Sequence, residues 1–144
     1  MTAEERRAIE WECTRLINLY ANRNDRRAWE EVVALYTVNG LMARPTAPDD
    51  PIVGQDALLA AFRARPPSAT RHVCANIVVT VESASAASAE SVILLFTGKL
   101  DPDGGLPSRD AGPPLVGEYR DRFELTDEGW RFSERRGRLS FKLG

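Results

Sequence analysis

The chain has 144 residues with ordinary hydrophobic (43%) and charged (28%) fractions, which fits a single soluble domain that buries its own core. Nineteen Lys and Arg residues against 21 Asp and Glu residues give a net charge of −2, which disfavours nucleic acid or an anionic membrane as the main partner. No apolar run approaches the roughly 20 residues that a membrane-spanning helix needs, and the first residues lack the apolar core of a signal peptide, so we expect a cytoplasmic protein.

The first residues have the pattern of two helices. Thr2 and Glu5 have the spacing of a capping box, and apolar side chains then recur at helical intervals as far as Tyr20. The polar run 22–25 predicts a break in the chain. A second helix is expected over residues 26–36, where apolar side chains again share one face.

The next segment combines turn signals with one more helix. Asn39-Gly40 predicts a turn before a short apolar segment at 41–43. Three prolines within residues 44–51 predict a loop, because proline lacks the N–H that a helix or a central strand requires. A third helix is expected to begin at Gly54-Gln55-Asp56 and to end at Pro66-Pro67.

The remainder of the chain alternates apolar and polar residues and predicts strands. Four antiparallel strands are expected, at residues 72–81, 91–100, 115–125 and 130–141. Helices followed by strands indicate an α+β fold with the helices on one face of a curved sheet. A strongly curved sheet around helices encloses a cone-shaped cavity, which is a common type of site for small molecules.

Three residues carry side chains suited to proton transfer: Tyr20, Asp25 and His72. A carboxylate beside an imidazole fixes the tautomer of the ring and makes it a better base. A tyrosine hydroxyl can donate a hydrogen bond to a substrate oxygen that gains charge in the transition state. Together these residues form a candidate acid–base site.

Each of the three residues also has a structural interpretation that the sequence leaves open. Asp25 could cap the helix that follows it, and Tyr20 could be a core aromatic with its hydroxyl at the surface. His72 could be a structural residue at the start of a strand. The cysteines, Cys13 and Cys74, lack metal-ligand spacing, so we expect two small buried thiols and no metal site.

Six segments of the chain resemble, in their order and spacing, the SnoaL-like branch of the nuclear transport factor 2-like superfamily. They are residues 20–25, 34–40, 54–58, 70–76, 117–121 and 129–136. The resemblance covers nearly the whole chain and implies a single domain over residues 1–144. It also implies a cystatin-like, cone-shaped α+β barrel in which three N-terminal helices pack in a strongly curved, mostly antiparallel sheet.

The resemblance to scytalone dehydratase and bile-acid 7α-dehydratase within that superfamily implies acid–base chemistry without a cofactor. The implied reaction is a dehydration, an isomerisation or a cyclisation of a small hydrophobic, oxygenated metabolite. Asp25 would orient His72, which would move the proton, and Tyr20 would polarise a carbonyl. Arg135 would bind an oxyanion or support the pocket wall, although the sequence does not decide whether Arg135 or Arg136 points inward.

A second set of residues is expected around this site. Asp121 is expected to be a structural partner of Arg135 or Arg120. The residues expected to line the substrate pocket are Trp29, Phe62, Asn76, Phe96 and Tyr119.

The alternative function is a non-catalytic ligand-binding or assembly domain, similar to the β subunits of ring-hydroxylating oxygenases. Self-association into a homodimer or homotrimer is expected under either hypothesis. Strict alternation places Val73, Ile77, Val79 and Val81 together on the sheet face opposite His72, and such an apolar outer face favours a second copy of the chain.

Overall fold

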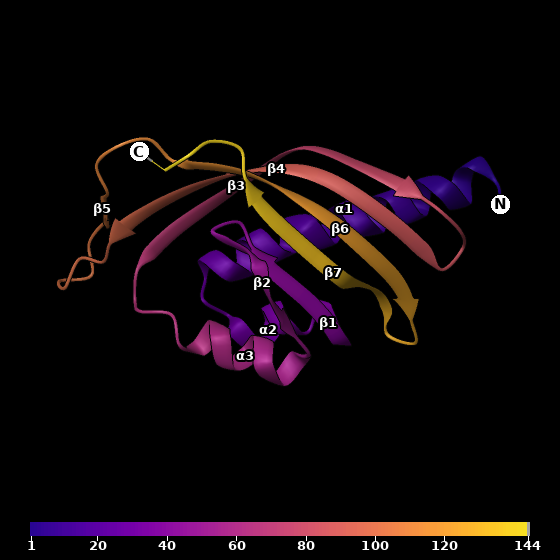
Figure 1. Cartoon of the computed structure of the whole chain (residues 1–144), viewed down its shortest axis with the longest axis horizontal. Coiled ribbons are helices and arrows are strands. Elements are labelled where there is room, and N and C mark those ends of the chain that lie inside the picture. The colour runs from indigo at the N-terminus through magenta and orange to yellow at the C-terminus, as the bar shows by residue number, and fades with distance from the viewer. Residues whose placement is uncertain (144) are drawn as a thin grey trace.

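The computed structural model describes residues 1–143, which form three helices and one sheet of seven strands. The helices are α1 (Ala3–Asp25), α2 (Trp29–Val33) and α3 (Gln55–Arg63). The strands are β1 (Tyr36–Arg44), β2 (Ala47–Val53), β3 (Ala69–Val81), β4 (Ala86–Lys99), β5 (Ser108–Arg109), β6 (Leu115–Thr126) and β7 (Gly129–Leu139). In Figure 1 the long strands arch over α1, and α2 and α3 lie under the same side of the sheet.

The strand order in the sheet is β2-β1-β7-β6-β4-β3, with the short β5 added to β4. The four long strands β3, β4, β6 and β7 form the expected antiparallel meander. The strand β1 pairs in parallel with β7, so the sheet is mixed. The sheet remains open, because β2 and β3 form its two edges and do not pair with each other.

The helix α1 begins where the sequence predicted and ends later than predicted. Both capping-box bonds are present, from the Glu5 amide to Thr2 Oγ1 at 3.0 Å and from the Thr2 amide to Glu5 Oε2 at 2.8 Å. The predicted break at 22–25 is wrong, because α1 continues through Asp25. Asn24 is buried in this last turn, where its side-chain oxygen accepts a hydrogen bond from Arg65. The Asn24 side chain therefore finds its hydrogen-bond partner in Arg65, so the backbone at residue 24 can remain helical.

The predicted second helix is shortened by strand pairing. The helix α2 covers only Trp29–Val33, because Tyr36 already begins β1 and lies opposite Phe132 of β7. The turn predicted at Asn39-Gly40 is also wrong, since both residues lie within β1. They fall where the register between β1 and β7 shifts, and Gly40 packs closely against the Tyr36 side chain.

The proline-rich segment predicted as a loop contains the strand β2. Its prolines, Pro48 and Pro51, are tolerated because β2 is an edge strand that pairs only with β1. The loop between β4 and β6 contains the short strand β5, in which Ser108 and Arg109 pair with β4.

A bulge in β3 reverses the faces that strict alternation predicts. The pairing with β4 shifts between Ala75 and Val78, and Asn76 has a φ of 52°, which lies in the left-handed region. The residues that follow are therefore displaced to the other face. The prediction that Ile77, Val79 and Val81 lie on the face opposite His72 is wrong. These side chains pack against the core on the same face as His72 and Cys74.

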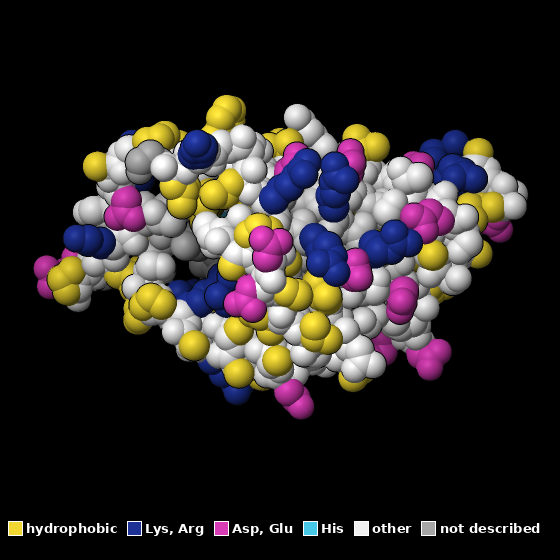
Figure 2. Space-filling model, viewed as in Figure 1, with side chains coloured by type: hydrophobic (Ala, Val, Ile, Leu, Met, Phe, Trp, Pro, Cys, Tyr) yellow, Lys and Arg dark blue, Asp and Glu magenta, His cyan; other side chains and the backbone are white. Residues whose placement is uncertain are grey.

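The outer face of the sheet accordingly differs from the one expected from the sequence. Of the four residues expected there, only Val73 is exposed. Figure 2 shows basic and acidic side chains gathered over β6 and β7, where Arg138 pairs with Glu118 and Arg136 pairs with Glu134. Self-association stays a prediction, but the apolar outer face from which it was inferred is not present among the described residues.

Candidate functional site

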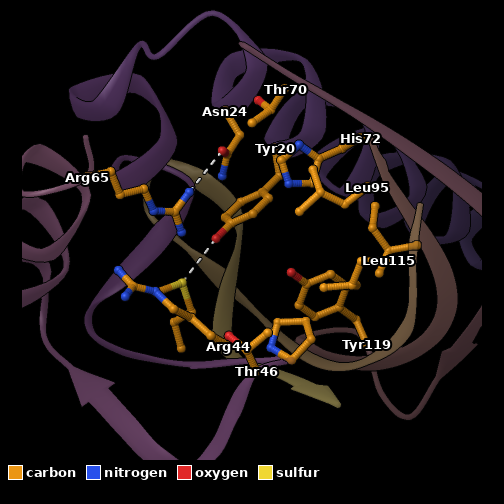
Figure 3. Close-up of a pocket in the computed structure, with 13 residues that line it drawn as sticks. Tyr20, Asn24, Arg44, Thr46, Arg65, Thr70, His72, Leu95, Leu115 and Tyr119 are labelled. Carbon is orange, nitrogen blue, oxygen red and sulfur yellow. Dashed lines mark hydrogen bonds between the residues drawn. The ribbon is translucent and has the colours of Figure 1, made fainter. Parts of the chain in front are cut away.

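A cavity of about 240 Å³ lies beside the C-terminal end of α1. Its wall combines residues of α1, β1, β3, β4 and β6 with the segment after α3 (Figure 3). Much of the wall is apolar, through Met42, Pro45, Ile93, Leu95 and Leu115. The volume lies just below the usual range for drug-sized ligands and suits a smaller molecule such as a single substituted ring.

Asp25 and His72 meet at this cavity although they lie on different elements. The Asp25 carboxylate, at the end of α1, lies 2.6 Å from His72 Nδ1 through its Oδ1 atom. Their side chains are only 5% and 12% exposed. The same carboxylate accepts hydrogen bonds from the His72 amide at 2.9 Å and from Thr70 Oγ1 at 3.0 Å. It is thereby fixed by three donors of β3.

These contacts determine how the imidazole presents itself to the cavity. A carboxylate accepts hydrogen bonds and does not donate them when ionised, so the proton of the neutral ring belongs on Nδ1. The lone pair is then on Nε2, which makes no hydrogen bond within residues 1–143. The His72 ring lines the cavity, and this arrangement provides a base that is open to a ligand.

Two tyrosines contribute hydroxyl groups to the same cavity. Tyr20 accepts a hydrogen bond from the Tyr36 hydroxyl at 3.1 Å. It donates to the sulfur of Met42 at 3.2 Å, shown as the dashed line from Tyr20 in Figure 3. A thioether is a weak acceptor, so a ligand oxygen could replace it at small cost. The Tyr119 hydroxyl has no hydrogen-bond partner among the described residues. Burial raises the pKa of both phenols above its usual value, so both remain hydrogen-bond donors.

Arg135 lies behind the tyrosine rings and is not among the residues that line the cavity. Its guanidinium carbon is 4.4 Å from the ring centroid of Tyr20 and 4.0 Å from that of Tyr119. Of the two roles expected for Arg135, support of the pocket wall fits this position and direct contact with an oxyanion does not. Arg136 is exposed and pairs with Glu134, which answers the question of which arginine points inward.

Asp121 is the partner of Arg135, as expected from the sequence. Arg135 Nε donates to Asp121 Oδ1 at 3.1 Å, and both side chains are almost completely buried. Burial raises the pKa of Asp121 to about 6 despite this pairing. The other carboxylate oxygen, Oδ2, is buried without a hydrogen-bond partner among the described residues. The positive charge of Arg135 is retained beside the carboxylate and the tyrosine rings.

The structure separates the other expected pocket residues. Tyr119 lines the cavity, whereas Trp29 and Phe62 stack on each other in the core with ring centroids 5.2 Å apart. Asn76 lies exposed at the bulge of β3, next to the exposed Ala75. Phe96 lines a different surface hollow, beside residues 109–115. The expected pocket positions of Trp29, Phe62, Asn76 and Phe96 are therefore corrected, since none of them lines this cavity. The helices α2 and α3 direct the rings of Trp29 and Phe62 into the core, whereas Asn76 and Phe96 lie on β3 and β4 away from the cavity.

Sequence reasoning missed five polar residues of the cavity wall, which are Asn24, Arg44, Thr46, Arg65 and Thr70. Arg44 and Arg65 line it, and Asn24 accepts a hydrogen bond from Arg65 at 3.2 Å (Figure 3). Arg44 is the last residue of β1 and Arg65 precedes two prolines, and neither position has a pattern that distinguishes it among the many arginines of the chain. No group of three or more His, Cys, Asp or Glu side chains arranged to hold a metal occurs within the described range 1–143. No helix in that range is long and apolar enough to cross a membrane.

A family model described as a SnoaL-like domain matches residues 5–136. A scytalone dehydratase-like protein from Novosphingobium aromaticivorans has a TM-score of 0.78 and 21% identity, with 97% of this chain and 89% of that chain covered. An NTF2-like protein with a cystatin-like fold from the same organism has a TM-score of 0.73 and 22% identity, covering 99% and 90%. A hexachlorocyclohexane dehydrochlorinase (LinA) of type 2 has a TM-score of 0.78 and 15% identity, covering 97% and 90%.

At these identities the solved structures establish the fold alone. The cystatin-like arrangement expected from the sequence, with helices in a curved and mostly antiparallel sheet, is confirmed. No protein with a curated description is significantly similar to the chain in sequence.

Proposed function

Because the chain belongs to the family of SnoaL-like domains, we propose that it is an acid–base enzyme that needs no cofactor and acts on a small, largely apolar, oxygenated molecule. The proposed reaction begins with removal of a proton from a carbon next to a carbonyl. Two structures similar to this chain are described as scytalone dehydratase-like and as a dehydrochlorinase. Both descriptions denote eliminations, which supports a reaction of this class.

The observation that carries the proposal is the contact between His72 and Asp25 in the cavity wall. The 2.6 Å separation of Nδ1 and Oδ1 orients the imidazole and balances the positive charge that the ring gains with a proton. Thr70 and the backbone hold the carboxylate in place, so the base is already positioned before a substrate arrives.

The proposed sequence of events balances without an external reagent. His72 Nε2 takes the proton, the electron pair of the C–H bond forms a double bond to the carbonyl carbon, and the π pair of the carbonyl moves to its oxygen. A hydroxyl of Tyr20 or Tyr119 donates a hydrogen bond to that oxygen as it becomes negative. When the carbonyl re-forms, a leaving group on the next carbon departs with its bonding pair, and the imidazolium protonates it if it is a hydroxide. Returning the proton to another carbon of the same molecule gives an isomerisation instead.

The test measures proton removal, which dehydration, isomerisation and cyclisation share. A panel of small cyclic ketones with a β-hydroxyl group is incubated with the protein in D₂O, and the α-proton is followed by ¹H NMR. We expect exchange or elimination that falls about 10²- to 10⁴-fold in His72→Asn and in Asp25→Asn, the range that a general base contributes.

The matched control is Val73→Ala, because Val73 is adjacent to His72 in β3 and is exposed on the opposite face. It should retain the full rate. If folded His72→Asn retained the wild-type rate, the proposal would be wrong. If no member of the panel exchanged in the wild-type protein, the non-catalytic ligand-binding alternative would be favoured.

A further inference from the structure

The cavity wall has an unbalanced positive charge. Its lining includes two arginines, Arg44 and Arg65, and no aspartate or glutamate. In Figure 3 both guanidinium groups lie on one side of the cavity, and the His72 ring lies on the other side with the Tyr20 ring between them. The basic wall and the proposed base therefore face the same space from different sides.

Arg65 is half-buried and forms no ion pair within residues 1–143. Its Nη1 donates to Asn24 Oδ1 at 3.2 Å, and its guanidinium carbon lies 4.5 Å from the ring centroid of Phe62. These neutral contacts position the group without neutralising it. Burial lowers the pKa of Arg65 below its usual value, and the positive charge of Arg44 contributes in the same direction. The two cations are therefore close enough to interact.

Arg44 is also without an acidic partner in the described part of the chain. Its Nη2 reaches only the Ala61 carbonyl, at 3.5 Å, and its Nε is buried with no hydrogen-bond partner. A buried N–H without an acceptor is costly, and native proteins rarely leave one unless a ligand or water completes it.

Seven other arginines of the chain lie within 4.0 Å of a carboxylate. Arg63, two residues before Arg65, pairs with Glu30, and Arg135 pairs with Asp121. Among the described residues, arginines without an acidic partner also occur elsewhere, but at the cavity both lining arginines lack one and no carboxylate shares the wall with them. Guanidinium groups match the planar geometry of a carboxylate, to which they can donate two parallel hydrogen bonds.

We propose that the substrate carries a carboxylate, which Arg44 and Arg65 hold on the side of the cavity away from His72. The apolar walls then receive a compact carbon skeleton, and its reactive carbon is directed to the imidazole. The inference rests on the proposed function for the reaction, but the recognition of the carboxylate is a property of the two arginines and can be measured without turnover.

The test compares two probes of equal shape, benzoate and benzamide, by isothermal titration calorimetry at neutral pH. Benzoate should bind at least about tenfold more tightly, since hydrogen bonds to charged groups contribute that much or more. Arg44→Met and Arg65→Met should each reduce the preference for benzoate several-fold. Arg63→Met is the matched control, because it removes an exposed arginine of α3 that already has a partner, and it should retain the preference.

Two additions keep the test decisive. If a methionine variant does not fold, Arg44→Lys and Arg65→Lys retain the charge but lose the planar double contact, and they should lose part of the preference. In His72→Asn the preference for benzoate should persist while proton exchange is lost.

The outcomes separate the two proposals. Equal affinity for benzoate and benzamide, or binding of neither probe at about 10 mM, where sites of millimolar affinity are filled, overturns the carboxylate proposal. A preference that survives both methionine variants also overturns it. In the wild-type protein, equal affinity for the two probes together with intact proton exchange leaves the proposed function standing. A wild-type protein that prefers benzoate but exchanges no proton contradicts only the proposed reaction.

Discussion

The Asp25 carboxylate is held by more contacts than a simple helix end requires. It accepts hydrogen bonds from Thr70 Oγ1, from the His72 amide and from His72 Nδ1. The helix that follows has Ala28 at its N-cap and no side-chain capping bond, so Asp25 does not cap it. Its three contacts are all with β3, and they join the end of α1 to the strand that carries the imidazole.

We predict that Asp25 determines the tautomer of His72. In the wild-type protein, ¹⁵N NMR of the single histidine should show Nδ1 protonated and Nε2 unprotonated when the ring is neutral. In Asp25→Asn the amide can either donate or accept, so a mixture of tautomers is expected. Arg71→Met is the control, since Arg71 is exposed and its guanidinium lies 4.0 Å from Asp25. A wild-type ring protonated mainly on Nε2 would contradict the proposed base.

The buried pair of Arg135 and Asp121 is predicted to be strongly coupled. Asp121→Asn leaves the buried guanidinium without a counter-charge, and we expect a loss of about 3–5 kcal/mol in the free energy of unfolding. Arg135→Met should cost a similar amount, and the double variant should cost clearly less than the sum of the two. Urea denaturation of the four proteins measures this coupling.

The control cycle uses Arg138 and Glu118, which pair on the exposed face of the sheet. A coupling of about 1 kcal/mol or less is expected there, because solvent screens the charges. A coupling of that size at Arg135 and Asp121 would show that the buried pair does not support the wall behind the two tyrosines.

At the scale of the elements, the bulge of β3 decides which side chains reach the core. Its left-handed residue, Asn76, allows His72 and Cys74 before the bulge and Ile77 and Val79 after it to share one face. Without the extra residue, either His72 and Cys74 or the apolar second half of the strand would face outward. The bulge therefore lets one strand serve both the cavity and the core.

The conformation of Asn76 gives a direct prediction. Asn76→Ala places a Cβ without a compensating polar side chain at φ 52°, whereas Asn76→Gly tolerates that angle. We expect Asn76→Ala to be less stable than Asn76→Gly by about 1 kcal/mol in urea denaturation. At Ala75, which lies in regular strand pairing, the order should reverse, because glycine weakens a strand there. Equal stability of the two Asn76 variants would contradict the strained geometry.

Most elements could be predicted from local patterns, and the errors have identifiable causes. The capping box of Thr2 and Glu5 and the alternation of the later strands are local signals, and both are confirmed. The strand β1 and the edge strand β2 depend on pairing with distant residues, which local propensity does not contain.

The candidate site was predictable to a similar degree. Tyr20, His72 and Tyr119 line the cavity beside Asp25, whereas the roles assigned to them stay predictions. The pocket assignments of Asn76 and Phe96 failed because a bulge and a strand face cannot be placed by counting residues. Arg44 and Arg65 gave no sequence signal, since their significance is the absence of an acidic neighbour in space.

At the scale of the whole molecule, the three tyrosines of the chain lie near Arg135, with Tyr20 and Tyr36 buried and Tyr119 partly buried in the cavity wall. Burial raises the pKa of Tyr20, Tyr36 and Tyr119 above the usual 10.0. A phenol whose pKa is raised on folding stabilises the native state at any pH below the pKa of the unfolded chain. That contribution is lost as the pH rises from the unfolded-state pKa to the folded-state pKa. Folding stability should therefore decline above about pH 10.

The measurement is absorbance at 295 nm, where phenolate is detected, during a titration to alkaline pH. The native protein should show no phenolate at pH 10, and the absorbance should increase only with the loss of near-ultraviolet circular dichroism. Tyr36→Phe should reduce the decline of stability between about pH 10 and 11, because one fewer buried phenol has to ionise. Ionisation of one or more tyrosines in the folded protein near pH 10 would contradict their burial.

The parallel pairing of β1 with β7 also has a consequence for how the protein is made. During synthesis, residues 36–44 leave the ribosome long before residues 129–139, to which they must hydrogen-bond. Contacts that join distant parts of a chain form slowly, because the intervening loop must close first. The wall that carries Met42 and Arg44 can therefore take its place only after translation has reached the last strand. The ability to bind a ligand should appear in the final step of folding, after the helices and the β3–β4 hairpin have formed.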